Sequence, residues 1–400
     1  KWAKQDYRTA QELETNLIEF TTAFAKRFNN KKTVVWMDVV NETILSNGKW
    51  FGPKKGTNKW ADLILKRSTN KAVFKYGVNP EKPLQGLRVA LDPGHLAHNL
   101  KMAEIEGKYV KMLASKATNG KKITFFEAAH NLATAHFLKE KLEVLGASVL
   151  MTRKALNDYP MGMSFNKWRK TEATSGLEKA LANQYIDSTR AELVRKGKVT
   201  DKQHFTWVYN QLDLRKRAEA INAWQPDLTV IIHYNITQAA WKDRTRRGFF
   251  PAAKDNFCMT FTPGSFMRGE LSRPIDRISF ARLLLSNDIN QSVALSSRVC
   301  DEFHSMLKIP YVTSESPTSY IERACVDTKK PGVYARNLTL SRLIASPLVY
   351  GESLCQEYPK EALALEKTPL KVAGMRTSKR VEQVADAYLE GIVKWVKKDQ

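Results

Sequence analysis

Apolar and polar residues follow two different spacings along this chain, and together they predict strands that alternate with helices. Short apolar runs rich in branched residues are typical of buried strands, and here they are 88–92, 147–152, 228–233, 257–261 and 348–350. Apolar residues that recur every three or four positions indicate helices, which we expect at 125–145, 207–224, 282–307 and 378–398. The alternation predicts an α/β fold with a mostly parallel, twisted sheet flanked by helices.

The first 83 residues stand apart from this alternation. Apolar residues at helical spacing predict one packed helix, whose stripe consists of Leu13, Leu17, Phe20, Phe24 and Phe28. A strand-like run at 33–40 follows, and Gly and Pro breaks at 80–86 indicate a linker. We therefore expect a small N-terminal extension or domain at 1–83, built from a helix and short strands, and a larger domain at 84–400. The pattern indicates no function for the first unit.

Two of the predicted strands end on a histidine. The first is followed by Asp92-Pro93-Gly94-His95, and the run at 228–232 leads directly into His233. In an open α/β sheet, ligands bind beyond the carboxyl ends of the strands, so the two imidazoles can converge on one metal ion. A histidine that closes an apolar strand is also commonly a hydrogen-bonded residue without a ligand role. The metal hypothesis therefore needs a third ligand.

Glu127 is the best candidate for this third ligand, because it lies at the start of the helix predicted at 125–145. With Thr124 it also has the Thr-x-x-Glu spacing of a capping box, in which the carboxylate accepts a hydrogen bond from the backbone and binds no metal. His130 lies three residues further along the helix, so it could form a ligand pair with Glu127. The spacing alone leaves these alternatives open.

The strand-end histidines, Glu127 and several further short motifs resemble those of the zinc-dependent N-acetylmuramoyl-L-alanine amidases, which cleave peptidoglycan. The family combines Asp-Pro-Gly-His, a ligand Glu at a helix start, a strand ending in Thr-Arg, a Leu-x-x-Arg helix, a strand ending in His-x-Asn, and a last strand ending on a catalytic Glu. The matching blocks here are 92–95, Glu127, 149–153, 214–222, 233–235 and 347–352. Their order and spacing cover roughly residues 84 to 360 and are more specific than any single motif.

The resemblance implies a role for each residue of a catalytic site. His95, Glu127 and His233 would hold zinc, and Glu352 would be the catalytic acid and base that takes a proton from water and passes it to the leaving amine. Two imidazoles and one carboxylate leave zinc an open position for water, whose pKa the ion lowers to about 7. The bond cut would be the amide between N-acetylmuramic acid and L-alanine of the stem peptide.

The same blocks provide two candidate substrate-binding residues, Arg217 and Asn235. Arginine forks bind carboxylates of the kind that stem peptides carry. The structural alternative for Arg217, as for Arg153, is pairing with protein carboxylates or helix ends. For Glu352 the structural alternative is a solvated carboxylate where a strand turns into a loop.

The chain departs from the family pattern after His95 and after Glu352. Leu96-Ala97 stands where the family has Gly-Gly, and Leu354-Cys355 stands where the family has Gly-Phe followed by Asn. These departures keep a catalytically silent peptidoglycan-binding scaffold open as an alternative. A second alternative is another zinc amidohydrolase or peptidase that acts on a soluble peptide-like substrate.

Three insertions interrupt the matched blocks, at 98–124, 157–206 and 236–330. They lie between strand ends and helices, where loops that contact substrate belong. The resemblance makes each a candidate cover over the metal, because some members of the family have such a cover. A protein activator that displaces it is then a further candidate partner.

The charge balance agrees with a cell-wall enzyme. The chain has 64 Lys and Arg against 41 Asp and Glu, a net charge of +23 that favours anionic partners, and peptidoglycan carries free carboxylates. Nucleic acid is negatively charged as well, but the sequence shows no zinc-finger, helix-turn-helix or RNA-binding motif. We therefore do not expect nucleic acid as a partner. No apolar run approaches the roughly 18 residues of a membrane span.

We expect a monomer that acts in the periplasm or is secreted, with its signal peptide removed, since the chain begins at Lys1 rather than Met. The four cysteines are Cys258, Cys300, Cys325 and Cys355. They form no Cys-x-x-Cys pair and therefore do not indicate a thiolate zinc site. Disulfides and buried free thiols are both compatible with their number.

Overall fold

The computed structural model describes residues 80–398, apart from 267–269, 271–275, 277–278, 281, 284–285, 314–315, 317–320 and 322–323. The helix and strands expected within 1–83 therefore lie outside the described residues, except for the last four positions. The division of the chain at residue 83 stays a prediction.

The central layer is a seven-stranded sheet with the strand order β4-β1-β5-β9-β6-β8-β7. Its strands are β1 (Arg88–Pro93), β4 (Ser148–Met151), β5 (Leu228–Asn235), β6 (Met259–Thr262), β7 (Cys325–Lys330), β8 (Val333–Arg336) and β9 (Leu348–Cys355). Strands β4, β1, β5 and β9 run parallel, whereas β6 is antiparallel to β9 and β7 is antiparallel to β8. All residues of β5 are buried, as expected for a parallel strand covered on both faces.

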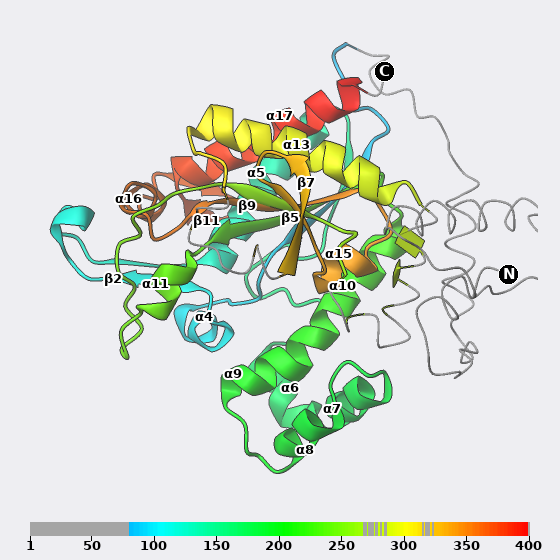
Figure 1. Ribbon diagram of the computed structural model, residues 1–400, viewed down its shortest axis with the longest axis vertical. Coiled ribbons are helices and arrows are strands. Elements are labelled where there is room, and N and C mark those ends of the chain that lie inside the picture. The colour runs from blue at the N-terminus through cyan, green and yellow to red at the C-terminus, as the bar shows by residue number, and fades with distance from the viewer. Residues whose placement is uncertain are drawn as a thin grey trace, which may run out of the picture.

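Helices cover both faces of this sheet (Figure 1). One face carries α5 (Glu127–Val144), α13 (Asp288–Leu307) and α17 (Lys379–Lys398), and the other carries α10 (Asn210–Trp224) and α15 (Thr339–Leu343). Neighbouring strand residues alternate between the two layers: Val89 packs in the core on the α5 side, and Ala90 packs in the core on the α10 side. This alternation is the two-residue period of a strand.

The first two expected insertions form compact additions to the sheet. Segment 98–124 contains α4 (Leu100–Glu106), a short helix η2 (Lys116–Thr118), and β2 (Tyr109–Met112) paired antiparallel with β3 (Ile123–Phe126). Segment 157–206 builds the helices at the bottom of Figure 1, which are α6 (Phe165–Thr171), α7 (Ala173–Ala182), α8 (Ser188–Arg195) and α9 (Asp201–His204). They pack around buried Trp168 and Phe165 and continue through the π-helical turn η3 (Phe205–Tyr209) into α10.

Segment 236–330 contains α11 (Gln238–Lys242), but it also contains β6 and α13, which belong to the sheet and its helical cover. After β9 the chain forms α16 (Pro359–Glu366) and a hairpin of β10 (Leu370–Val372) and β11 (Met375–Thr377). Within the described ranges, no helix has both the length and the apolar character needed to cross a bilayer. The four cysteines are free thiols, and all but Cys325 are buried.

The expected fold, a mostly parallel α/β sheet flanked by helices, is confirmed. Several boundaries differ, such as that of α13, which begins at Asp288 and not at 282, and two of the differences lie next to the site. Phe125 and Phe126 were expected in a helix, but they end β3, where they pair with β2. Strand β9 does not end at Tyr350 but continues to Cys355, because β5 and β6 pair with it on both sides.

Candidate metal centre

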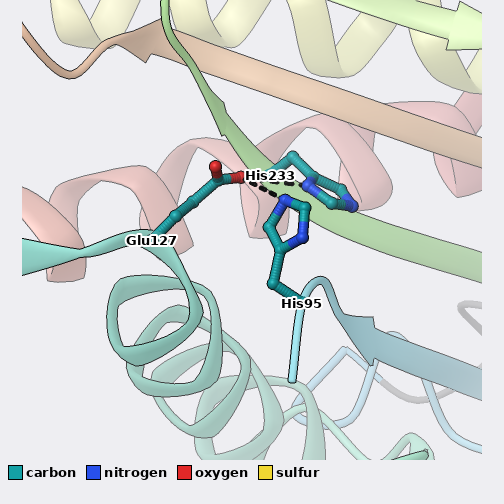
Figure 2. A group of neighbouring side chains, drawn as sticks. All are labelled: His95, Glu127 and His233. Carbon is teal, nitrogen blue, oxygen red and sulfur yellow. Dashed lines mark hydrogen bonds and ion pairs between the residues drawn. The ribbon is translucent and has the colours of Figure 1, made fainter. Parts of the chain in front are cut away.

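Three side chains from different elements meet at one edge of the sheet (Figure 2). His95 follows β1, Glu127 begins α5, and His233 lies in β5. One nitrogen or oxygen atom from each lies within 4.8 Å of the others. Glu127 Oε1 is 3.2 Å from His95 Nε2 and 3.0 Å from His233 Nδ1. The convergence expected from the two strand-end histidines is therefore present, with Glu127 between them.

The backbone at the end of β1 is shaped to let His233 approach. A Cβ atom on Gly94 would lie only 2.2 Å from Cε1 of His233, so any larger residue would displace the ring. His233 is held on its other side by Tyr350, whose ring is stacked on it at 4.6 Å between centroids. His95 itself has a φ of 66°, an uncommon conformation for a residue other than glycine. Asn131 Nδ2 fixes this turn by donating a hydrogen bond to Gly94 O.

Glu127 does not form the capping box that its spacing with Thr124 allowed. Thr124 lies in β3, and the residue that caps α5 is Phe126, which makes no side-chain capping bond. The Glu127 carboxylate instead accepts a hydrogen bond from the backbone amide of Tyr234, and its Oε1 lies 3.0 Å from His233 Nδ1. The capping alternative was therefore wrong.

His130 is not part of this group of three. Its ring packs against Phe125 and Tyr234, with centroid distances of 4.8 and 5.9 Å. Burial lowers the pKa of His130 to about 4, so the ring is neutral at pH 7. The structure gives His130 a packing role beside the site and not a place in the cluster.

Glu106, at the end of α4, lies behind His95 and was missed by the sequence analysis. Its carboxylate binds His95 Nδ1 at 2.9 Å and accepts hydrogen bonds from the backbone amides of Leu96 and Ala97. The bond to Nδ1 leaves Nε2 of His95 facing Glu127. A carboxylate behind a histidine commonly orients it as a metal ligand. No motif marks Glu106, because it is eleven positions from His95 in an insertion.

The charges at this site are set by burial and by close neighbours. Burial alone would raise the pKa of Glu127, but His95, Lys108 and the hydrogen bond from His233 outweigh it and hold that pKa well below its usual range. Burial, and then the neighbouring His95, lower the pKa of His233 to about 4. At pH 7 Glu127 is therefore a carboxylate and His233 a neutral imidazole, which are the forms that bind metal ions. For His95 burial acts to lower the pKa, but the charges of Glu127 and Glu106 outweigh it and raise the pKa.

Glu352 lies next to this cluster in the middle of β9. It is the register partner of His233 on β5 and of Met259 on β6, so it does not stand at a strand-to-loop turn as the structural alternative assumed. Burial and the nearby charge of Glu127 raise the pKa of Glu352 to about 7. A carboxyl group that changes protonation near neutral pH is suited to both accepting and donating a proton.

The other two candidate residues make contacts that hold the framework together. Arg217 is buried, with Nη1 3.3 Å from an oxygen of Asp92 and Nε 2.7 Å from an oxygen of Asp213. This links α10 to the strand that ends at His95. Asn235 Nδ2 lies 3.9 Å from the Sγ atom of Cys355 on β9. Substrate binding by Arg217 and Asn235 stays a prediction.

The sequence matches the family model described as N-acetylmuramoyl-L-alanine amidase over residues 89–394, which is most of the chain. The chain belongs to this amidase family. The match confirms the family and the enzyme class expected from the resemblance, and peptidoglycan is the substrate that the family implies. A comparison with curated proteins found no match to this amidase.

Solved amidase structures resemble this chain at low sequence identity. The CwlD amidase from Clostridioides difficile, solved in complex with the GerS lipoprotein, is 17% identical with a TM-score of 0.41, covering 78% of this chain and 99% of the other. The amidase Ami1 from Mycobacterium smegmatis is 16% identical with a TM-score of 0.42, covering 79% and 99%. The assignment of this amidase rests on the family match and on the site, not on these likenesses.

The contacts of Glu106 lead to a first prediction. Glu106→Gln should weaken the binding of added Zn²⁺ by about 10- to 100-fold, because an amide orients the His95 ring less firmly than a carboxylate. Competition with a chelator of known affinity measures this change. The matched control is Glu104→Gln on the same helix, since Glu104 is exposed and pairs with Lys111. Equal zinc affinity in both variants would exclude an orienting role for Glu106.

Proposed function

We propose that this amidase is zinc-dependent, that His95, Glu127 and His233 hold the ion, and that Glu352 transfers the proton. Its reaction is the hydrolysis of the amide between N-acetylmuramic acid and L-alanine in peptidoglycan. One observation carries the proposal. In a chain of this amidase family, the carboxylate of Glu127 lies between the imidazoles of His95 and His233, and all three side chains are of kinds that bind metal ions.

The donor atoms fit zinc. Nε2 of His95 and Oε2 of Glu127 are buried and have no hydrogen-bond partner, which is unusual and costly for atoms of this kind. Zinc binds nitrogen and oxygen ligands at about 2.0–2.2 Å, so ligands of one ion lie roughly 3–4 Å apart. The distances of 3.2 and 3.0 Å from Glu127 Oε1 to the two histidines lie in this range. Histidine and carboxylate are ordinary zinc ligands.

When bound, zinc polarises a carbonyl oxygen and lowers the pKa of a bound water to about 7. The protein supplies the positioning and the proton transfer. Glu352 accepts a proton from the attacking water and donates it to the nitrogen of the leaving L-alanine, which its pKa of about 7 allows in both directions. Tyr350 and Gly94 fix the plane of His233, and Glu106 fixes that of His95.

The departures from the family pattern do not favour a silent scaffold. The backbone amides of Leu96 and Ala97, which replace the usual Gly-Gly, are both bound by Glu106. Leu354 and Cys355 lie within β9, so the strand that carries Glu352 is intact. The altered residues therefore leave the arrangement of the proton-transfer group and the three metal-binding side chains in place.

The cell wall is the place of action that the family implies, and we propose a periplasmic or secreted enzyme. Its net charge of +23 supports contact with an anionic polymer. We propose that it acts as a monomer. A protein activator is a further candidate partner, to be recognised by faster hydrolysis of purified sacculi in its presence.

Two buried histidines allow a matched test of the metal ligands. His233→Ala should reduce zinc from about one ion per chain to below about 0.1, because the remaining two ligands bind weakly. His130→Gln should keep about one ion per chain, since His130 lies outside the cluster. Elemental analysis of both purified variants measures the zinc content. Zinc loss in His130→Gln with retention in His233→Ala would assign the second histidine ligand to α5.

Replacing Glu352 should separate chemistry from metal binding. Glu352→Gln should lower the rate of amide hydrolysis by about 10²- to 10⁴-fold, because the amide cannot transfer the proton. Zinc content should stay that of the unmodified enzyme. The measurement is release of peptides with a free L-alanine amine from purified sacculi, followed by mass analysis. Full activity of this variant would remove Glu352 from the mechanism.

The raised pKa of Glu352 predicts the direction of the pH dependence. The group acts as a base when it is ionised, so activity is present above its pKa and is lost as the pH falls through it. The positive charge of a bound zinc ion lowers this pKa, so the acidic limb of kcat/KM should lie at or below about pH 7. The residual activity of Glu352→Gln should lack this limb. A limb that persists in the variant would belong to another group.

A further inference from the structure

Lys108 is the exposed neighbour of an otherwise buried cluster. Its Nζ atom lies 3.9 Å from Oε2 of Glu127, and 41% of its side chain is exposed. The side chains of His95, Glu127 and His233 are only 13%, 1% and 7% exposed. A substrate that reaches the cluster past this side chain therefore meets a positive charge close to the reacting amide.

Two more cations gather next to Lys108. Lys202 from α9 and Arg244 after α11 lie over the ring of Trp241, at 5.0 and 4.4 Å from its centroid. A Cβ atom on Gly107 would lie 3.1 Å from Lys202 Nζ and 3.3 Å from Cη2 of Trp241. Gly107 directly precedes Lys108, so Lys202 and the ring of Trp241 lie against the backbone that carries Lys108. We call Lys108, Lys202 and Arg244 the cationic rim.

Within the described ranges, Glu127 of the metal cluster is the one carboxylate that pairs with the rim, through Lys108 at 3.9 Å. Among the residues that the structure describes, neither Lys202 nor Arg244 forms an ion pair, whereas nearby Lys111 is paired with Glu104. Burial, and then the charges of Arg244 and Lys108, lower the pKa of Lys202. Gathering like charges costs free energy, and such an uncompensated arrangement is expected where a ligand of opposite charge binds.

We propose that the cationic rim is a subsite for the free α-carboxylate of the D-glutamate that follows L-alanine in the stem peptide. This inference rests on the proposed function, because it takes the peptide as the part of the substrate that passes Lys108. Carboxylates are the anionic groups that stem peptides carry close to this amide, and lysine and arginine bind them through charge-assisted hydrogen bonds.

The position of the two cations over the Trp241 ring favours a carboxylate ligand over a nucleic acid. Proteins that bind single strands combine a positive groove with aromatic rings on which bases stack. Trp241 has Lys202 and Arg244 over its ring, so the ring holds the two cations together and is not free to stack a base. The three cations form one compact group beside the metal centre.

The test compares Lys202→Gln and Arg244→Gln on two substrates that differ in one charge. These are N-acetylmuramoyl-L-alanyl-D-glutamate, which has free α- and γ-carboxylates, and its α-amide, N-acetylmuramoyl-L-alanyl-D-isoglutamine, which keeps only the γ-carboxylate. The pair therefore tests the α-carboxylate, and we call the compound in which this group is free the carboxylate substrate. Each variant should raise KM for the carboxylate substrate about tenfold, the loss of one charged hydrogen bond, with kcat unchanged within about twofold. KM for the amide should change less than about twofold. Lys371→Gln on β10 removes the same charge from a separate sheet and should change neither.

An unchanged KM for the carboxylate substrate, or an equal rise for both substrates, would overturn the inference and leave the proposed function intact. If the unmodified enzyme hydrolyses neither substrate, the proposed function fails for these compounds. Calorimetry then tests the subsite by measuring the affinity of the carboxylate substrate for each variant. This affinity should fall in both variants if the rim binds the carboxylate, and it should stay unchanged if the rim does not. Weaker binding of a single-stranded oligonucleotide in both variants, with peptide affinity unchanged, would assign the rim to nucleic acid.

Discussion

The parallel pairing of β1, β5 and β9 is the constraint on which the site depends. In this register Pro93 lies opposite Ile232, and His233 lies opposite Glu352, so the ends of three separate strands reach the same edge of the sheet. Shifting the pairing by one residue would turn these side chains to the opposite face. The buried apolar residues of β5 and its neighbours on both faces hold this register. The geometry of the site is thus a consequence of hydrophobic packing along the strands that carry it.

The site also shows how a folded chain tolerates charge in its interior. Burying an ion is costly unless a partner of opposite charge is close. Arg217 meets this requirement by pairing with Asp92 and Asp213, and the pair with Asp92 ties α10 to β1 just before the turn that presents His95. Glu106 is held by His95 and two backbone amides. The cations over Trp241 are different, because neither Lys202 nor Arg244 forms an ion pair with a described residue, and this difference is why we assign them to ligand binding.

The sequence predicted the parts of the site that follow from strand ends and motif order. His95 and His233 could be found because each closes an apolar run, and Glu127 because it begins the next helix in the family pattern. The capping box failed because pairing of β3 with β2 keeps Thr124 in a strand, so its side chain cannot cap α5. Glu106 and Lys202 could not be predicted. Their contacts with His95 and Gly107 join segments distant in sequence, and no local spacing records which loops fold back onto the sheet.

In this enzyme, the residues of the sheet and α5 and the residues of the inserted segments have different tasks. The sheet and α5 supply His95, Glu127, His233 and Glu352, to which we assign the chemistry of the family. The segments inserted between these elements supply Glu106, which supports a ligand, and the three cations beside the cluster. A fold does not by itself determine which substrate is used, since recognition depends on the residues around the reacting centre. Because the inserted segments pack on the sheet without interrupting its central strands, they can change what is recognised while the geometry of the reaction stays the same.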